Sequence, residues 1–294
     1  MKLLTNNLLL ALIFAFSAQG ASALEIALIG DKSKREAFTK LVKEVGGVKS
    51  SASGVLRATI RSENITFSVT EVSDEPFAIA NQLLTADLAL LVVDATQGPL
   101  PITTEQLIIA RQARIPNLAI FFASTLPLQR DAPKDAAELL ELEEMEMREL
   151  LGKYEMKGEA AVVLFDSDVS RISKAKFSRG LQDLRQYIRS VSTKRPKLPA
   201  PKQVNEYLCY YYLLSNPEAN GRGAVLSNGD RIDVWHEGQS TSAVVKTKAT
   251  HKPGDNGEFV LSLSAPLPAY EASRTILARN GAVIGVGVVK SVLR

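Results

Sequence analysis

The segment from Asp87 to Pro116 constrains the fold more than any other part of this chain. It begins with an unbroken apolar run, Leu88 to Val93, which is typical of a parallel strand buried on both faces. A loop with one glycine and two prolines follows: Gly98, Pro99 and Pro101. Thr103 or Thr104 can cap a helix that ends at the segment's last proline. A second apolar run, Leu118 to Phe122, comes next, so the pattern predicts strand, helix and parallel strand joined by a right-handed crossover.

The same alternation extends to both sides of this segment. Leu24 to Ile29 and Ala161 to Phe165 are short apolar runs that predict two more buried strands. Arg171 to Val191 predicts a helix, because apolar residues recur in it at helical spacing: Phe177, Leu181, Leu184 and Ile188. Strands that alternate with helices indicate a doubly wound α/β domain, here over residues 24–192.

Leu139 to Leu151 predicts an amphipathic helix. Four residues are expected on its apolar face: Leu139, Leu142, Met145 and Leu150. Four glutamates are expected mostly outside it: Glu141, Glu143, Glu144 and Glu146. Paired glutamates can act as general acids or metal ligands, but a solvated helix face is the commoner reason for such a run.

The pattern changes after residue 192. Thr193 to Gln203 holds three prolines and four basic residues without apolar periodicity, which predicts an extended linker over residues 193–205. From Tyr207 onward, strands of roughly eight residues are separated by turn sequences. The turns are Asn220-Gly221, Asn228-Gly229-Asp230, Gly254 to Gly257 and Asn280-Gly281. Residues 206–294 are therefore predicted to form an all-β sandwich or barrel.

Composition excludes several classes of site. The net charge is only +3, so no global basic field favours nucleic acid. Cys209 is the single cysteine, which rules out an internal disulfide, and it lies in an apolar run typical of a packing residue. With only His236 and His251, neither a Cys/His metal site nor a Ser/His/Asp nucleophile can be assembled.

Tyr210, Tyr211, Tyr212 and Trp235 offer an alternative, a stacking platform for nucleic acid. Successive residues of a strand face opposite sides, so at least one of the three tyrosines must point inward. A core strand is therefore the preferred interpretation.

Met1 to Ala23 matches a secretory signal peptide, with a charged start, an apolar centre and a small-residue cleavage site at Ala21-Ser22-Ala23. The apolar stretch is too short for a membrane anchor. A buried N-terminal strand or helix is the alternative. The pattern predicts an exported protein, either periplasmic or secreted.

Three blocks, in order along the chain, resemble bacterial elongation factor Tu. They are Asp94 to Pro101, Leu139 to Leu151, and Pro253 to Leu293. Four further residues support the first block by their spacing: Glu105, Arg111, Gln112 and Pro116. The resemblance implies a GTPase-type α/β domain followed by that family's third domain, a Greek-key β-barrel. The chain has no room for the family's middle domain, which holds the aminoacylated end of transfer RNA, and the family's cytosolic members carry no leader.

The resemblance also places a phosphate-binding loop after the first strand. The family's Gly-His-Val-Asp-His-Gly-Lys-Thr falls on Gly30 to Ala37, where only the first glycine is retained. Arg35 replaces the second glycine, Glu36 the phosphate-binding lysine, and Ala37 the magnesium-binding threonine. At about 4 Å and an effective dielectric near 20, exchanging an ammonium for a carboxylate costs on the order of 8 kcal/mol. Lys32, Lys34 and Arg35 can offset part of this cost, but a solvated turn that opens a helix is the favoured interpretation of this stretch.

The other nucleotide motifs are replaced as well. The family's magnesium and water-positioning segment falls on Ser68 to Val72, and its guanine-reading segment falls on Ala123 to Leu126, where leucine stands in place of the aspartate. The next motif falls on Asp166 to Asp168 and retains at most Ser167. Gly46 to Arg61, at the place of the first switch, has no recognisable effector threonine.

These replacements predict an exported pseudo-GTPase that acts as a binding module, with no catalytic residue, metal or cofactor. Its protein partner is expected to meet the barrel or the interdomain groove, and nucleic acid is not expected as a partner. The alternative is a GTPase that binds GTP or GDP with magnesium through the degenerate loop positions Gly30, Lys32, Ser33 and Lys34. A third hypothesis is a cytosolic translation-factor relative without a true leader.

Overall fold

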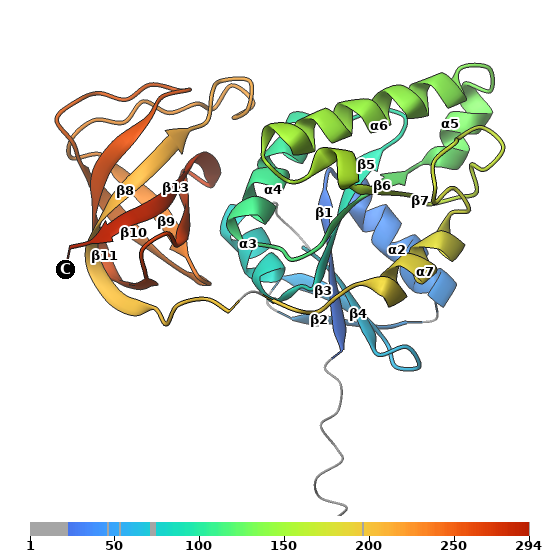
Figure 1. Ribbon diagram of the computed structural model, residues 1–294, viewed down its shortest axis with the longest axis horizontal. Coiled ribbons are helices and arrows are strands. Elements are labelled where there is room, and N and C mark those ends of the chain that lie inside the picture. Colours follow the sequence, from blue (N-terminus) through green and yellow to red (C-terminus); the bar gives the residue numbers. More distant parts are fainter. Residues whose placement is uncertain (1–22, 46, 53, 71–74, 196, 294) are drawn as a thin grey trace, which may run out of the picture.

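The computed structural model describes residues 23–45, 47–52, 54–70, 75–195 and 197–293. Figure 1 shows two units, a helix-covered sheet and a β-barrel. The leader predicted over Met1 to Ala23 lies outside the described residues, except for Ala23.

The first unit is built on a seven-stranded sheet in the order β2-β3-β4-β1-β5-β6-β7. Its strands are β1 (Leu24–Gly30), β2 (Val48–Ala52), β3 (Val55–Ile60), β4 (Ile65–Thr70), β5 (Leu88–Asp94), β6 (Leu118–Ala123) and β7 (Val162–Phe165). The strands from β4 to β7 run parallel, whereas β3 is antiparallel to both β4 and β2. The sheet is therefore mixed, and the β2–β3 hairpin fills the segment between Gly46 and Arg61.

Helices cover both faces of this sheet. They are α2 (Ser33–Val45), α3 (Pro76–Thr85), α4 (Pro101–Gln112), α5 (Thr125–Asp131), α6 (Ala136–Lys153) and α7 (Leu181–Ser190), with a short 3₁₀ turn η2 (Gly158–Ala160). In β5, Ala89, Leu91 and Val93 pack with α3, α4 and α6. Leu88, Leu90 and Val92 pack with α2 and α7 on the other face. Both faces being covered explains why this strand is apolar at every position.

Helix α4 begins at Pro101, two residues before the earlier of the two predicted capping threonines. The Thr103 hydroxyl accepts a hydrogen bond from the backbone N–H of Leu100 at 3.2 Å, so it still closes the first turn. The helix ends at Gln112, four residues before Pro116.

Two sequence-based predictions about helices are wrong. The buried residues of α6 are Ala136, Leu140, Glu143, Met147 and Leu151, whereas Leu142 is 45% and Met145 51% exposed. The predicted face was thus rotated about the helix axis. Residues Arg171 to Gly180 are not helical, because α7 begins only after Gly180. Gly180 has a φ of +60°, and a Cβ there would lie 2.6 Å from the carbonyl carbon of Ser167.

The second unit is a closed antiparallel barrel in the order β10-β11-β8-β13-β12-β9. Its strands are β8 (Lys202–Leu213), β9 (Arg231–His236), β10 (Gln239–Lys246), β11 (Asn256–Ala269), β12 (Arg274–Arg279) and β13 (Ala282–Val292). β8 thus begins within the segment predicted as linker. Cys209 and Tyr211 lie in the barrel core with 0% and 1% exposure, while Tyr210 faces outward.

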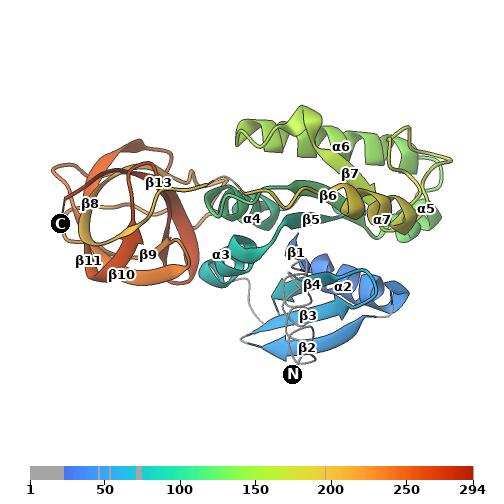
Figure 2. The ribbon, with the colours of Figure 1, turned by 60° about the horizontal axis from the view of Figure 1, so that its bottom comes forward.

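The barrel packs against α3 and α4, as Figure 2 shows. Gln112 at the end of α4 donates to the carbonyl oxygens of Thr275 at 2.8 Å and Gly287 at 3.1 Å. The Trp235 indole N–H donates to Asn81 on α3 at 2.7 Å. Apolar barrel residues join the core that α3 and α4 form with the sheet: Leu214, Trp235, Ile276, Val283 and Val286. A continuous apolar core therefore crosses from one unit to the other.

Within the described parts of the chain, every helix is too short or too polar to cross a membrane.

Candidate functional site

The candidate site lies at the carboxyl ends of the parallel strands. In open α/β sheets this edge, where the strand-to-helix loops gather, is the usual place for ligands. Loops of this kind follow β1, β5, β6 and β7, and those after β1, β6 and β7 contain three of the four motifs that the resemblance assigns to nucleotide binding.

The loop after β1 is very short. Only Asp31 and Lys32 separate the end of β1 at Gly30 from the start of α2 at Ser33. Gly30 has a φ of +121°, and a Cβ there would lie 2.0 Å from the carbonyl oxygen of Val92 on β5. Its backbone N–H donates to the Gln106 side chain on α4 at 2.6 Å. The retained glycine thus serves close packing of β1 against β5 and α4.

The Asp31 carboxylate occupies the start of α2. It accepts from the backbone N–H of Ser33 at 2.7 Å and from the backbone N–H of Asp94 at 3.2 Å, and it is 2% exposed. The unpaired N–H groups and the dipole make a helix N-terminus a binding site for anions. Here the anion belongs to the chain itself.

Lys34 is 1% exposed, and its ammonium donates to the carbonyl oxygen of Gly30 at 3.0 Å. Lys32, Arg35 and Glu36 are exposed, whereas Ala37 packs in the core under α2. The prediction of a solvated turn was therefore wrong for Asp31, Ser33 and Lys34, which are buried. The prediction that this stretch opens a helix is correct.

A second aspartate closes the loops after β6 and β7. The Asp166 carboxylate accepts from the backbone N–H groups of Ser124 and Thr125, at 3.2 Å each, and from the Thr125 hydroxyl. Lys40 on α2 donates to it at 2.8 Å. Asp166 is 7% exposed, whereas Leu126, which stands at the guanine-reading position, is 56% exposed. This carboxylate thus ties the start of α5 to the end of β7.

Neither aspartate was singled out from the sequence, although a signal for both exists. Asp31 and Asp166 each follow an apolar strand by one residue, and a serine or threonine opens a nearby helix. That combination is typical of a side chain that caps helix N–H groups. Of the segment predicted at Ser68 to Val72, Glu71 and Val72 lie outside the described residues, and Ser68 is buried, with its hydroxyl donating to the Ile26 carbonyl oxygen at 3.3 Å.

The residues present do not fit a nucleotide phosphate with magnesium. The backbone N–H of Ser33 at the start of α2 donates to the Asp31 carboxylate, and the Lys34 ammonium donates to the carbonyl oxygen of Gly30. In the described ranges, no three histidine, cysteine or acidic side chains come together as metal ligands.

A third buried carboxylate, Glu143 on α6, was expected to be solvated and is instead 8% exposed. Burial first, and then the charges of Glu146 and Asp94, raise its pKa to about 8. It lies beside Gly98 in the loop after β5.

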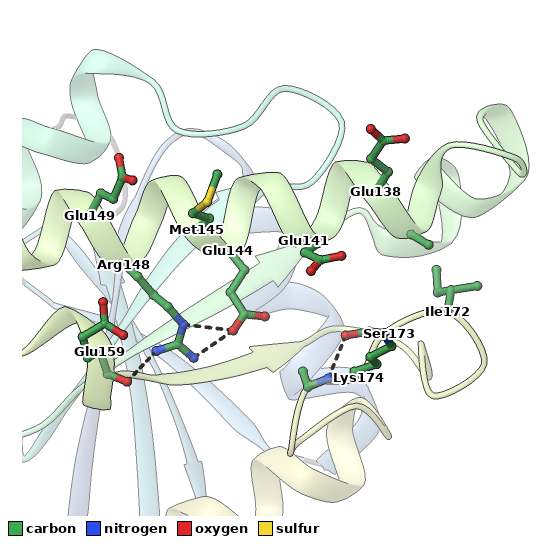
Figure 3. Close-up of a pocket in the computed structure, with 12 residues that line it drawn as sticks. Glu138, Glu141, Glu144, Met145, Arg148, Glu149, Glu159, Ile172, Ser173 and Lys174 are labelled. Atoms are coloured by element: carbon green, nitrogen blue, oxygen red, sulfur yellow. Dashed lines mark hydrogen bonds and ion pairs between the residues drawn. The ribbon is translucent and has the colours of Figure 1, made fainter.

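The outer side of α6 borders a broad groove of about 710 Å³ (Figure 3). It is lined by Glu138, Glu141, Glu144, Glu149 and Glu159 together with Arg148 and Lys174, among others. Glu144 is bonded to Arg148 at 2.8 Å, and Arg148 also donates to backbone carbonyl oxygens around η2. Among the described residues, Glu138, Glu141 and Glu149 have no ion-pair partner, so the groove is acidic.

A smaller hollow of about 270 Å³ lies between the two units, with Arg111, Tyr154, Tyr212 and Glu218 in its lining. Glu218 is 6% exposed and accepts hydrogen bonds from the Tyr212 hydroxyl at 2.5 Å and the Tyr154 hydroxyl at 2.6 Å. This hollow is part of the interdomain region at which a partner was predicted.

The residues considered for other chemistry lie in the core. Trp235 is 1% exposed and contacts Asn81, so it offers no stacking surface. The structure brings the Ser273 hydroxyl within 2.9 Å of His236 Nε2, a pair not foreseen from the sequence. Both residues are 0% exposed, and burial lowers the pKa of His236 to about 4, so this pair supports packing. Burial likewise raises the pKa of the Cys209 thiol to about 12, which suits an inert thiol. No model of a known protein family matches this chain.

Proposed function

We propose that this chain is a binding protein built on a GTPase-like scaffold whose nucleotide site is closed by its own side chains. The observation that carries the proposal is the Asp31 carboxylate at the start of α2, where a nucleotide phosphate would have to lie. Asp166 occupies the loops where a base would be read.

The proposed relationship to elongation factor Tu rests on the three sequence blocks and agrees with the arrangement of the two units. The strand order of the barrel, in which β8 and β9 are not neighbours and neither are β11 and β12, is compatible with a Greek key. A doubly wound, GTPase-type topology is proposed for the sheet on the same grounds.

The competing proposal is a GTPase with a weak or rebuilt site around Gly30, Lys32, Ser33 and Lys34, using GTP or GDP with magnesium. Of these residues only Lys32 is exposed. Opening the site would require Asp31 to leave the N–H groups of Ser33 and Asp94, and it would require Lys34 to leave the core. The burial of these groups favours the binding protein.

We further propose that the partner is a protein that meets the barrel or the interdomain region, and that the chain is exported through its leader. The acidic groove on α6 adds a surface suited to a basic partner, because Glu138, Glu141 and Glu149 line it together with the exposed Met145.

Isothermal titration calorimetry of the chain starting at Leu24, with GTP and GDP and with and without magnesium, tests the proposal. The expected result is no heat at millimolar nucleotide, matched by an unchanged melting temperature. A matched Glu36→Lys variant restores the missing lysine and is also expected to bind no nucleotide, because Asp31 still occupies the helix start. Stoichiometric, magnesium-dependent binding by the unmodified chain would establish the GTPase alternative.

A further inference from the structure

Glu143 is a buried carboxylate with an oxygen left unpaired. Its Oε2 atom is buried and has no hydrogen-bond partner among the residues that the structure describes. Ionisation would leave this oxygen with neither water nor a hydrogen-bond donor, which is unfavourable. The neutral form avoids most of that penalty.

The loop between β5 and α4 forms the cover of this carboxyl group. A Cβ built on Gly98 would lie in van der Waals contact, 3.8 Å from both Cγ and Oε1 of Glu143, so Gly98 lies next to this side chain. The loop is folded by two backbone bonds, from the N–H groups of Gln97 and Gly98 to the Asp94 carbonyl oxygen, each 2.9 Å long. Movement of this loop away from α6 would open the carboxyl group to water.

The charged groups that face Glu143 are both acidic. Asp94 faces it from the end of β5, and Glu146 faces it from α6 itself. No lysine or arginine in the described ranges forms an ion pair with it, whether from α4, from the loop or from α6. The surroundings therefore favour the neutral carboxyl group twice, through burial and through like charge.

We propose that Glu143 is a proton-operated latch on the loop from Asp94 to Leu100, which lies closed against α6 while Glu143 is neutral and is released when Glu143 ionises. Closure is fully favoured below the ordinary pKa of 4.5. It weakens as the pH rises from there to about 8, the pKa in the closed state, and is constant above.

The loop leads directly into α4, which holds the barrel. The Glu105 carboxylate on α4 accepts from Arg222 at 2.7 Å and from the backbone N–H of Val283 at 3.3 Å. Gln106, the next residue, holds the backbone of Gly30. Release of the loop would thus be transmitted to the interface between the two units, and this holds whether or not the chain binds nucleotide.

Amide hydrogen exchange of residues 95–98 and 100, compared at pH 6 and pH 9 after correction for the intrinsic exchange rate, tests the latch. In the unmodified protein the protection of these amides is expected to fall at least tenfold between the two pH values. Glu143→Gln keeps the shape and removes the charge, so its protection is expected to stay within about twofold. Glu141→Gln removes the same charge from the exposed side of α6 and should behave like the unmodified protein.

Equal loss of protection in Glu143→Gln and in the unmodified protein would overturn the proposal, and so would unchanged protection in both. A ¹³C titration of the glutamate carboxyl groups in the unmodified protein gives a test that needs no variant. A midpoint near 8 for Glu143 is expected, and a midpoint near its ordinary value of 4.5 would contradict the latch.

Discussion

Three buried carboxylates at the same end of the sheet differ in how their charge is compensated. Asp31 and Asp166 each accept hydrogen bonds from backbone N–H groups at the start of a helix, and Asp166 also contacts Lys40. Glu143 has one oxygen, Oε2, without a hydrogen-bond partner in the described part of the chain, and it has two acidic neighbours. Burial alone therefore does not define the role of an acidic side chain. The first two are fitted to hold structure, whereas the third is fitted to respond to pH.

The largest effect is expected for a carboxylate that is fully compensated. Asp166→Ala leaves the N–H groups of Ser124 and Thr125 without their acceptor and should lower the free energy of unfolding by about 3 kcal/mol. Urea denaturation measures it. The control is Asp131→Ala, which removes an exposed aspartate of α5 and should change the free energy of unfolding far less. If both variants lowered the free energy of unfolding equally, Asp166 would not stabilise the protein through its hydrogen bonds to the start of α5.

Removing the charge of Glu143 is expected to raise the free energy of unfolding, unlike removal of Asp166. Its folded pKa of about 8 lies above its ordinary value, so its ionisation destabilises the folded state increasingly between about pH 5 and pH 8. Glu143→Gln should therefore raise the free energy of unfolding by about 2 kcal/mol at pH 9 and change it little at pH 5. Urea denaturation at the two pH values gives the comparison. If Glu143→Gln instead lowered the free energy of unfolding at pH 9, the Glu143 carboxylate would stabilise the fold, as Asp31 and Asp166 are expected to do.

A smaller loss of stability is expected for Gln112, the neutral side chain that connects the two units. Gln112→Ala removes the donor that joins the carbonyl oxygens of Thr275 and Gly287 across the two units. The expected loss is about 1.5 kcal/mol, independent of pH between 5 and 9. Thermal unfolding with one probe in each unit checks whether both still melt together, as the shared core requires. Separate transitions already present in the unmodified protein would show that the core does not couple the units.

The smallest effect is expected on the outer side of α6. Met145→Ala should change the free energy of unfolding by less than about 0.5 kcal/mol because the side chain is 51% exposed, whereas Met147→Ala, at 0% exposure, should cost about 2 kcal/mol. Denaturation curves of the pair test which face of the helix is buried. A larger loss of stability in Met145→Ala than in Met147→Ala would mean that the face of α6 predicted from the sequence is the buried one.

The α/β order was predictable because buried parallel strands must be apolar at every position, as in β5. The barrel was predictable from its regularly spaced turns. The buried face of α6 was not, because Leu142 and Glu143 exchange the places that hydrophobicity assigns to them. The helix predicted from Arg171 failed at Gly180, whose backbone conformation depends on contact with Ser167.

The resemblance named Gly30, Lys32, Ser33 and Lys34 as loop positions, but the contacts of these residues were not predictable. Lys34 and Asp31 were predicted to be exposed because the local sequence is rich in charge, but both are buried. Local charge carries no information about how closely β5 and α4 pack against this loop. That packing depends on residues more than sixty positions away, such as Asp94 and Gln106.

The most direct test of the account is a titration of the ¹⁵N-labelled protein with GTP and magnesium, followed at the backbone amides of Ser33 and Thr125. These amides already donate to Asp31 and Asp166. Neither resonance is expected to shift up to millimolar nucleotide. A saturable shift of both resonances would contradict it, because it would mean that the two carboxylates yield their places to a bound nucleotide.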